Sequence, residues 1–379
     1  MSVTQISASQ RIPVVDFLRG LVLLGVAASN YMNFQQAGIA QTGINKYLDA
    51  AENIFFGPVW ISLSFLFGFG FWSLIEKLKS QRQKIIPAFL KRMFWLFLIG
   101  VFNSFFYYGD ILRDFAVMGI FLLLFLNMEK KTLLTIASVL TVFIPLVAAF
   151  TLQSGFYHRH DWFELQHLFE SQNWKDAMQY NFMRLKLHQI ENPYYLVSVH
   201  FEMLVFFLWG ILSFRFNLFQ EQTRTKIYAK YLFLISLSGI LITWGTANFF
   251  ELKMINLYFQ INVLLEMLYA MLIISIGCFI FLFGFFPKLT EAIKIYGRMT
   301  LSNYIFQNMI SFLLFSGAGF AIGLKQPLWV YFFIAVLVYL SQIFISLIWF
   351  RKFSLGPFEW IWRSLSLWKK IPNFKTHQK

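Results

Sequence analysis

The residues best suited to chemistry lie in the apolar stretch from Arg11 to Asn33. On a helix with 3.6 residues per turn, Asp16, Arg19 and Asn30 share one face. Ionisable groups within a membrane helix are costly and usually face the protein interior, so they indicate a functional site. The alternative is a structural pair, in which Asp16 and Arg19 bind each other near the lipid headgroups. Asn30 lies deeper, where that alternative explains it less well.

Two amides and an arginine accompany a later apolar segment, 299–322. Asn303 and Gln307 lie one helical turn apart on one face, and Arg298 precedes them. We expect these amides either to line a site or to hold neighbouring helices together by hydrogen bonds.

Acidic residues and a histidine lie in three other apolar segments. Glu266 lies in segment 259–286. His200 and Glu202 lie in segment 194–214, and their spacing of two makes them face different directions on a helix.

Segment 110–127 begins with polar residues. Asp110 is either a helix cap or a binding residue. Arg113 and Asp114 lie further in, and we expect them to find polar partners.

These residues form two groups, which are expected to lie near opposite sides of the membrane. Arg19 and Arg298 fall near the cytoplasmic side, where guanidinium groups suit a phosphate-bearing ligand. His200, Glu202 and Glu266 fall near the outer side, where they suit general acid–base catalysis or proton transfer.

The composition indicates that these segments lie in a membrane. The chain of 379 residues is 58% hydrophobic and 13% charged, whereas soluble proteins carry roughly 25% charged residues. Apolar runs of membrane length recur, which predicts an all-α polytopic transmembrane bundle in a single domain, 1–379. About ten membrane helices are expected, at 13–34, 54–75, 88–107, 110–127, 132–153, 194–214, 228–250, 259–286, 299–322 and 327–350.

The basic residues predict the orientation of the bundle. Most of the 32 Lys and Arg residues fall on one side when the helices alternate, which predicts that both termini are cytoplasmic. The link 154–193 would then be outer and amphipathic, after the five helices of 13–153. The five helices of 194–350 follow it, and 351–379 forms a basic cytoplasmic tail. Because the positive charge lies between apolar runs, we expect membrane lipids and not nucleic acid as its partner.

We expect no metal site. Cys278 is the single cysteine, and the pattern His158-x-His160-Asp161 is too weak to predict metal binding. The sequence leaves the oligomeric state open.

Four motifs carry a resemblance to a known family. They are Arg-x-x-x-x-Asp-x-x-Arg-Gly at 11–20, Gly-Asp-Ile-Leu at 109–112, GRMTLSNYIFQ at 297–307 and GPFEWIWRSLSLWK at 356–369. Together they resemble the bacterial YeiB-like family of multi-pass membrane proteins, which implies an inner-membrane bundle of about ten helices.

The first segment is also distantly similar to the membrane acyltransferase superfamily, which includes O-acyltransferases and heparan glucosaminide acetyltransferases. That similarity implies acyl transfer from a cytoplasmic acyl-coenzyme A to a sugar on the other side. Asn30 stands where the O-acyltransferases have a catalytic His, and residues 34–53 contain no His. A base would therefore come from His200, Glu202 or Glu266.

Two functions remain open. In an acyltransferase, Arg19 and Arg298 would bind donor phosphates, while Asn30, Asn303 and Gln307 would polarise the thioester carbonyl. The acceptor would be a glycan or a lipid-linked sugar. In a transporter or flippase of an anionic amphiphile or small metabolite, the same residues, with Asp16, Asp110 and Arg113, would form a binding site and proton relay.

Overall fold

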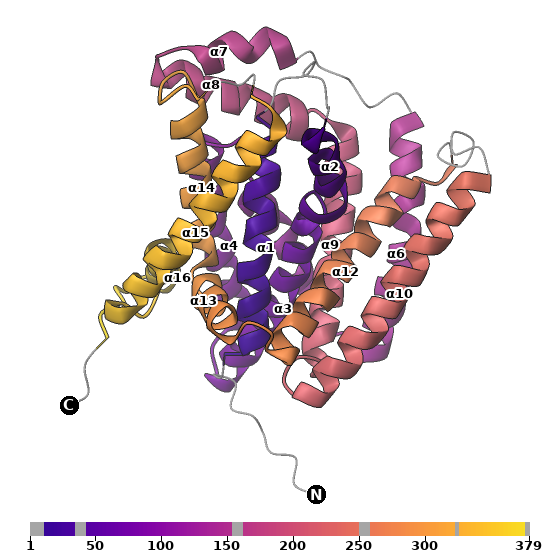
Figure 1. Ribbon diagram of the computed structural model, residues 1–379. Coiled ribbons are helices and arrows are strands. Elements are labelled where there is room, and N and C mark those ends of the chain that lie inside the picture. Colours follow the sequence, from indigo (N-terminus) through magenta and orange to yellow (C-terminus); the bar gives the residue numbers. More distant parts are fainter. Residues whose placement is uncertain (1–10, 35–42, 154–161, 250–257, 323–325, 376–379) are drawn as a thin grey trace, which may run out of the picture.

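The computed structural model describes residues 11–34, 43–153, 162–249, 258–322 and 326–375. These residues form helices joined by short connections, as the all-α prediction expects (Figure 1). The helices are α1 (Pro13–Met32), α2 (Ile44–Ala51), η1 (Glu52–Phe56), α3 (Val59–Ser80), α4 (Ile85–Ser104), α5 (Leu112–Phe121), η2 (Leu122–Phe125), α6 (Lys130–Gln153), η3 (Trp162–Leu165), α7 (Gln166–Glu170), α8 (Trp174–Leu185), η4 (Lys186–Ile190), η5 (Tyr195–Val199), α9 (His200–Arg215), α10 (Gln222–Phe249), α12 (Ile261–Phe283), α13 (Pro287–Gly297), α14 (Thr300–Phe315), α15 (Leu328–Lys352) and α16 (Pro357–Leu367).

Within the described residues, 8 helices are long and apolar enough to cross a membrane, which makes this a membrane protein. They are α1, α3 with the preceding α2 and η1, α4, α6, η5 with α9, α10, α12 and α15.

Two of the ten expected segments form shorter helices. Segment 110–127 contains α5, of 10 residues, followed by the 3₁₀ turn η2. Segment 299–322 contains α14, whose 16 residues extend about 24 Å at 1.5 Å per residue, less than a hydrocarbon core of about 30 Å. The count of ten is therefore not confirmed, although both helices belong to the bundle.

Helix α1 lies at the centre of the bundle, where it packs against α3, α12, α13, α14 and α15 (Figure 1). Its Asp16 is buried, with 8% of the residue exposed. By contrast, α10 and α15 carry many exposed apolar side chains, as expected of helices that face lipid. The most polar membrane helix is thus also the one most enclosed by protein.

Two helix pairs approach so closely that only glycine fits. A methyl group on Gly68 of α3 would lie 2.0 Å from the Phe207 carbonyl oxygen of α9, and one on Gly210 would lie 2.0 Å from the Phe65 carbonyl oxygen. Gly20 of α1 and Gly297 of α13 make a similar contact. Such small-residue contacts let membrane helices pack backbone against backbone.

The described part of the long link, 162–190, forms η3, α7, α8 and η4. In Figure 1, α7 and α8 cover the end of the bundle opposite the start of α1. The described part of the link therefore packs across one end of the bundle.

The C-terminal segment folds back after α15. Helix α16 follows Gly356, and the backbone of Phe353 then pairs with that of Phe374. Asn373 accepts hydrogen bonds from the Leu355 amide and from Ser354. The basic tail expected at 351–379 therefore contains helix α16, after which the chain turns back to pair with Phe353.

Candidate functional site

A cavity of about 420 Å³ opens among α1, α3, α4, α14 and α16. Its lining residues include Arg11 at the start of α1, Lys77 near the end of α3 and Arg363 in α16. The start of α1, the end of α3 and α16 all lie towards the lower part of the bundle in Figure 1, away from α7 and α8. Six cationic side chains contribute to the lining: Arg11, Arg19, Lys77, Arg92, Arg298 and Arg363.

Two carboxylates also line the cavity, and both have partners. Asp16 forms an ion pair with Arg19, with 3.2 Å between Oδ1 and Nη1. Glu359 accepts hydrogen bonds from the Ser302 amide at 3.2 Å and from the Ser302 hydroxyl at 2.5 Å. Cationic charge therefore remains in excess around the cavity.

The excess charge acts on two arginines at the cavity mouth. Burial lowers the pKa of Arg298, and the nearby Arg11 guanidinium lowers it further. Burial also lowers the pKa of Arg363, with repulsion from Arg11 and Arg19 adding to the shift and Glu359 opposing it. Arg298 lies over the Phe350 ring, 4.2 Å from its centroid, and its buried Nε has no hydrogen-bond partner among the described residues. An anion in the cavity would relieve this repulsion.

The inner part of the cavity is apolar. In α3 the lining cation Lys77 lies near the end of the helix, and Leu74 and Leu66 line the cavity deeper along it. Leu23 lies above Arg19 in α1, and Leu96 lies above Arg92 in α4. The apolar lining also includes Leu63, Leu66, Phe67, Met93, Leu112 and Phe115. The cavity thus matches a ligand with an anionic head and an apolar part.

All four sequence motifs contribute to this cavity. The first supplies Arg11, Asp16 and Arg19, and the second supplies Ile111 and Leu112. The third contributes Gly297, Arg298, Thr300, Leu301 and Tyr304, and the last contributes Glu359, Trp362 and Arg363. Segments that are far apart in the sequence therefore build one site.

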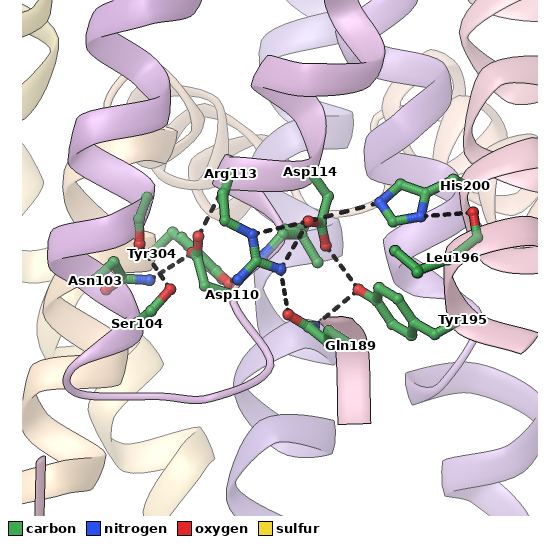
Figure 2. Close-up of polar contacts among 12 residues, drawn as sticks. Asn103, Ser104, Asp110, Arg113, Asp114, Gln189, Tyr195, Leu196, His200 and Tyr304 are labelled. Carbon is green, nitrogen blue, oxygen red and sulfur yellow. Dashed lines mark hydrogen bonds and ion pairs between the residues drawn. The ribbon is translucent and has the colours of Figure 1, made fainter. Parts of the chain in front are cut away.

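A buried polar network begins beside the cavity, at the start of α5 (Figure 2). Asp110 is fully buried and accepts hydrogen bonds from Asn103 Nδ2 at 2.7 Å and from the Arg113 amide at 3.1 Å. The second bond satisfies an amide in the first turn of α5, as expected of a capping residue.

The network continues through the ion pair of Arg113 and Asp114, in which Nη2 lies 2.8 Å from Oδ1 (Figure 2). Tyr195 donates to Asp114 Oδ2 at 2.7 Å, and Gln189 donates to the Tyr195 hydroxyl at 2.8 Å. Arg113 also donates to Gln189. His200 Nε2 lies 3.6 Å from Asp114 Oδ1, and its Nδ1 lies 3.1 Å from the Leu196 carbonyl oxygen. The structure therefore brings together Asp110, Arg113 and His200, three of the residues singled out by the sequence.

A thin wall separates this network from the cavity. Ile111 and Leu112 line the cavity, although they lie between Asp110 and Arg113 in the chain. The Ile111 amide donates to the Tyr304 hydroxyl at 3.4 Å, and Tyr304 also lines the cavity. One turn of backbone and one tyrosine thus stand between the cationic cavity and the buried carboxylates.

Glu202 and Glu266 form a separate cluster. Glu202 is buried, with 3% exposed, and its carboxyl repels that of Glu266, which is half-buried in α12. Glu266 in turn interacts with Glu52, which accepts a hydrogen bond from Ser29. The expected catalytic set is therefore divided, because Glu202 faces these carboxylates while His200 faces Asp114.

The amides expected at the site make helix–helix hydrogen bonds. Asn30 donates to Asn308 Oδ1 at 3.2 Å. Asn303 donates to the Tyr296 carbonyl oxygen at 3.1 Å, and Gln307 donates to the Tyr296 hydroxyl at 3.0 Å. None of Asn30, Asn303 and Gln307 is among the residues that line the cavity.

Several site residues were not singled out from the sequence. For Lys77 and Arg92, the sequence predicts only a share in the positive charge that orients the bundle. Glu359, Trp362 and Arg363 lie in the last motif, GPFEWIWRSLSLWK, so the motif itself was the signal that marked them. Gln189 and Tyr195 carried no recognisable signal.

The residues that the structure describes contain no cluster of side chains suited to bind a metal ion. In these ranges, no group of three or more His, Cys, Asp or Glu side chains is arranged to hold an ion. His158, His160 and Asp161 lie outside the described residues.

Comparisons with known proteins find a family of unknown function and uncharacterized bacterial relatives. Residues 213–369 match a family described as "Protein of unknown function (DUF418)". The chain is 24% identical to "Uncharacterized protein YxaH" of Bacillus subtilis (strain 168), over 96% of each chain. It is 38% identical to "Uncharacterized protein YeiB" of Escherichia coli (strain K12) over 98 residues, which are 24% of this chain and 25% of the relative. No solved structure matches the chain.

Proposed function

We propose a function from the premise that the chain belongs to the YeiB-like DUF418 family of membrane proteins. The protein acts as a membrane acyltransferase. It takes an acyl group from a phosphate-bearing thioester of the acyl-coenzyme A type on the cytoplasmic side. It transfers that group to a glycan or lipid-linked acceptor on the outer side. The observation that carries this proposal is one cavity that combines six cationic side chains with an apolar interior.

The cavity suits such a donor because its two parts match the two parts of the ligand. The guanidinium groups of Arg19, Arg298 and Arg363 bind donor phosphates, with which they form forked, charge-assisted hydrogen bonds. The acyl chain enters the apolar part, beside Leu66 and Phe115. Neither part alone would select an amphiphile.

Transfer requires the acyl carbonyl to meet the acceptor near the wall formed by Ile111 and Tyr304. The acceptor hydroxyl oxygen attacks the thioester carbonyl carbon, the carbon–sulfur bond breaks, and an ester and a free thiol result. The hydroxyl proton passes to His200, which Asp114 orients, and finally protonates the departing thiolate. The wall must open for this step, since it separates His200 from the cavity.

Transport of an anionic amphiphile or small metabolite is the alternative function. It is favoured by the lack of a histidine among the cavity-lining residues and by the hydrogen-bonded state of both lining carboxylates. In that case the cavity holds the cargo, and Asp110, Arg113 and Asp114 form part of the gate or proton relay. Both functions place the protein in the bacterial cytoplasmic membrane, with cytoplasmic termini.

Release of free thiol from an acyl-coenzyme A by the purified protein tests the proposal. We expect thiol to appear faster when a soluble glycan or a lipid-linked sugar is added as acceptor. Arg298→Gln should slow the reaction, whereas Arg224→Gln, which alters an exposed arginine paired with Glu221, should not. Saturable acyl-coenzyme A binding without thiol release, together with uptake of the label into proteoliposomes, would instead establish transport.

A further inference from the structure

Helix α16 has one face that belongs to the cavity. Glu359 and Arg363 line the cavity from this helix, and Trp362 Nε1 donates to the Arg92 carbonyl oxygen of α4 at 2.8 Å. Phe358 donates its amide to Ser302 Oγ at 2.9 Å, which ties the start of α16 to α14. This face is therefore turned towards the cavity, α4 and α14.

Apolar side chains of α16 and of the segment that follows it are exposed. Ile361 is 37% exposed, Leu367 is 48% exposed and Trp368 is 74% exposed. Lys369 and Lys370 follow directly and are also exposed. Phe374 adds an apolar side chain that is 73% exposed. We call these residues, Ile361, Leu367, Trp368, Lys369, Lys370 and Phe374, the α16 surface.

The α16 surface has a fixed shape. Trp368 takes the left-handed conformation that ends the helix, and its amide donates to the Leu365 carbonyl oxygen. Trp360 Nε1 donates to the Ile371 carbonyl oxygen at 2.7 Å, and the Leu355 amide donates to Asn373. The lysines and Phe374 are thus held on a folded hairpin.

The surface continues onto the neighbouring membrane helix. The Trp95 ring of α4 lies 6.3 Å from the Trp368 ring, measured between centroids. Phe94 beside it is 56% exposed, and Lys91 is exposed as well. Helix α4 is long and apolar enough to cross a membrane, so the α16 surface joins a surface of α4 on which exposed aromatic and basic side chains lie close together.

We propose that the α16 surface binds anionic phospholipid in the leaflet at this end of the bundle. Tryptophan and apolar residues next to lysines form the pattern of an interfacial helix, in which the rings enter the headgroup region and the lysines contact lipid phosphates. The lipid is a boundary ligand that holds α16 in place, and α16 is one wall of the cavity. This inference does not depend on the reaction proposed above.

Lipid retention measured by native mass spectrometry tests the proposal. The protein is reconstituted with equal amounts of phosphatidylglycerol and phosphatidylcholine, and the lipids that stay bound are counted. We expect wild type to retain more phosphatidylglycerol, and Lys369→Gln/Lys370→Gln to lose that preference by at least about fivefold. The control Lys226→Gln/Lys230→Gln removes the same amount of charge from exposed positions on α10. This control should keep the wild-type preference for phosphatidylglycerol.

A second measurement keeps the wild-type lysines. A polarity-sensitive fluorophore is attached to Leu367→Cys, and the buried native Cys278 contributes little background. We expect its emission to shift to the blue when nanodiscs of phosphatidylcholine are replaced by nanodiscs containing phosphatidylglycerol. Three results would overturn the proposal. Wild type and Lys369→Gln/Lys370→Gln could retain phosphatidylglycerol equally, or the control could lose the preference as strongly as Lys369→Gln/Lys370→Gln does. The third is fluorophore emission that does not change between the two kinds of nanodisc.

Discussion

Gly20 and Gly297 lie in direct backbone contact, and this contact joins α1 to the end of α13. A methyl group on Gly297 would lie 2.7 Å from the Gly20 amide nitrogen and 1.9 Å from the Asp16 carbonyl oxygen. The two glycines belong to the first and third sequence motifs. Their contact brings Asp16 and Arg19 to the same cavity as Arg298, which follows Gly297 directly.

Gly297→Ala is expected to destabilise the protein by about 1–3 kcal/mol, the range for overpacking, because the helices must separate to admit the new methyl group. Thermal unfolding in detergent measures the effect. Gly245→Ala is the matched control, since a methyl group there meets nothing within 4 Å and alanine favours the helix. Equal melting temperatures for the two variants would show that the backbone contact is looser than described.

Arg19→Lys keeps the positive charge but removes the forked geometry of the guanidinium group. We expect the affinity for acyl-coenzyme A to fall by about 1–3 kcal/mol, the range for hydrogen bonds to charged groups, with little change in melting temperature. Titration calorimetry measures the affinity, and Arg224→Lys on the exposed surface is the control. Wild-type affinity in Arg19→Lys, with unfolding in Arg19→Ala, would assign the Asp16–Arg19 pair a purely structural role.

Asp114→Asn removes the charge that Arg113, Tyr195 and His200 surround. The buried Arg113 guanidinium then loses its ionic partner, and we expect the unfolding free energy to fall by about 3 kcal/mol or more. Glu221→Gln, at an exposed pair with Arg224, should cost no more than about 0.5 kcal/mol. A similar small loss in both variants would mean that water reaches Arg113 in the folded protein.

The buried position of His188 in η4 leads us to expect that the protein loses stability in acid. Burial, with the nearby Arg184 charge, lowers the pKa of His188 to about 4. The unfolded chain binds a proton below about pH 6.5, whereas the folded protein keeps this imidazole neutral. Stability therefore falls as the pH decreases from 6.5 towards 4, by about 2 kcal/mol at pH 5.

Melting temperatures at pH 7 and pH 5 test this effect. His188→Gln should lose less stability than wild type over that interval. His167→Gln, which alters an exposed histidine, should behave as wild type does. An identical pH dependence in all three proteins would assign the acid sensitivity to other groups.

The orientation of the bundle can be tested at Gln172, an exposed residue between α7 and α8. We expect Gln172→Cys to react with an impermeant thiol reagent added outside intact cells, because this link is predicted to be outer. The wild type provides the background, since Cys278 is buried. If Gln172→Cys reacts only after the cells are lysed, the link faces the cytoplasm and the predicted orientation is wrong.

The sequence predicted the class of fold well because apolar length is a strong local signal. The structure also brings Asp16, Arg19 and Arg298, which were singled out from the sequence, to one cavity. The number of membrane helices was harder to predict. Segments 110–127 and 299–322 are apolar enough, but their helices are shortened by the turn at η2 and by the end of α14 at Phe315.

The details of the site depend on contacts between distant segments, which the sequence does not display. Asn303 and Gln307 looked like ligand-binding amides, yet both bind Tyr296, a partner that only the packing of α13 and α14 identifies. Arg363 was read as part of a basic tail. It reaches the cavity because Glu359 and Ser302 fix α16 against α14.

The glycine contacts also determine which parts of the cavity wall are stiff. Gly68 and Gly210 fasten α3 to α9, and Gly20 and Gly297 fasten α1 to α13, in each case through backbone that cannot slide without a clash. Helix α16 is attached differently, by side-chain hydrogen bonds from Trp362 and to Glu359. Of the three walls α1, α3 and α16, the first two are therefore held rigidly, and α16 is the one that moves most easily. Displacing α16 to admit a ligand larger than 420 Å³ would break a few hydrogen bonds and leave the glycine contacts of α1 and α3 intact.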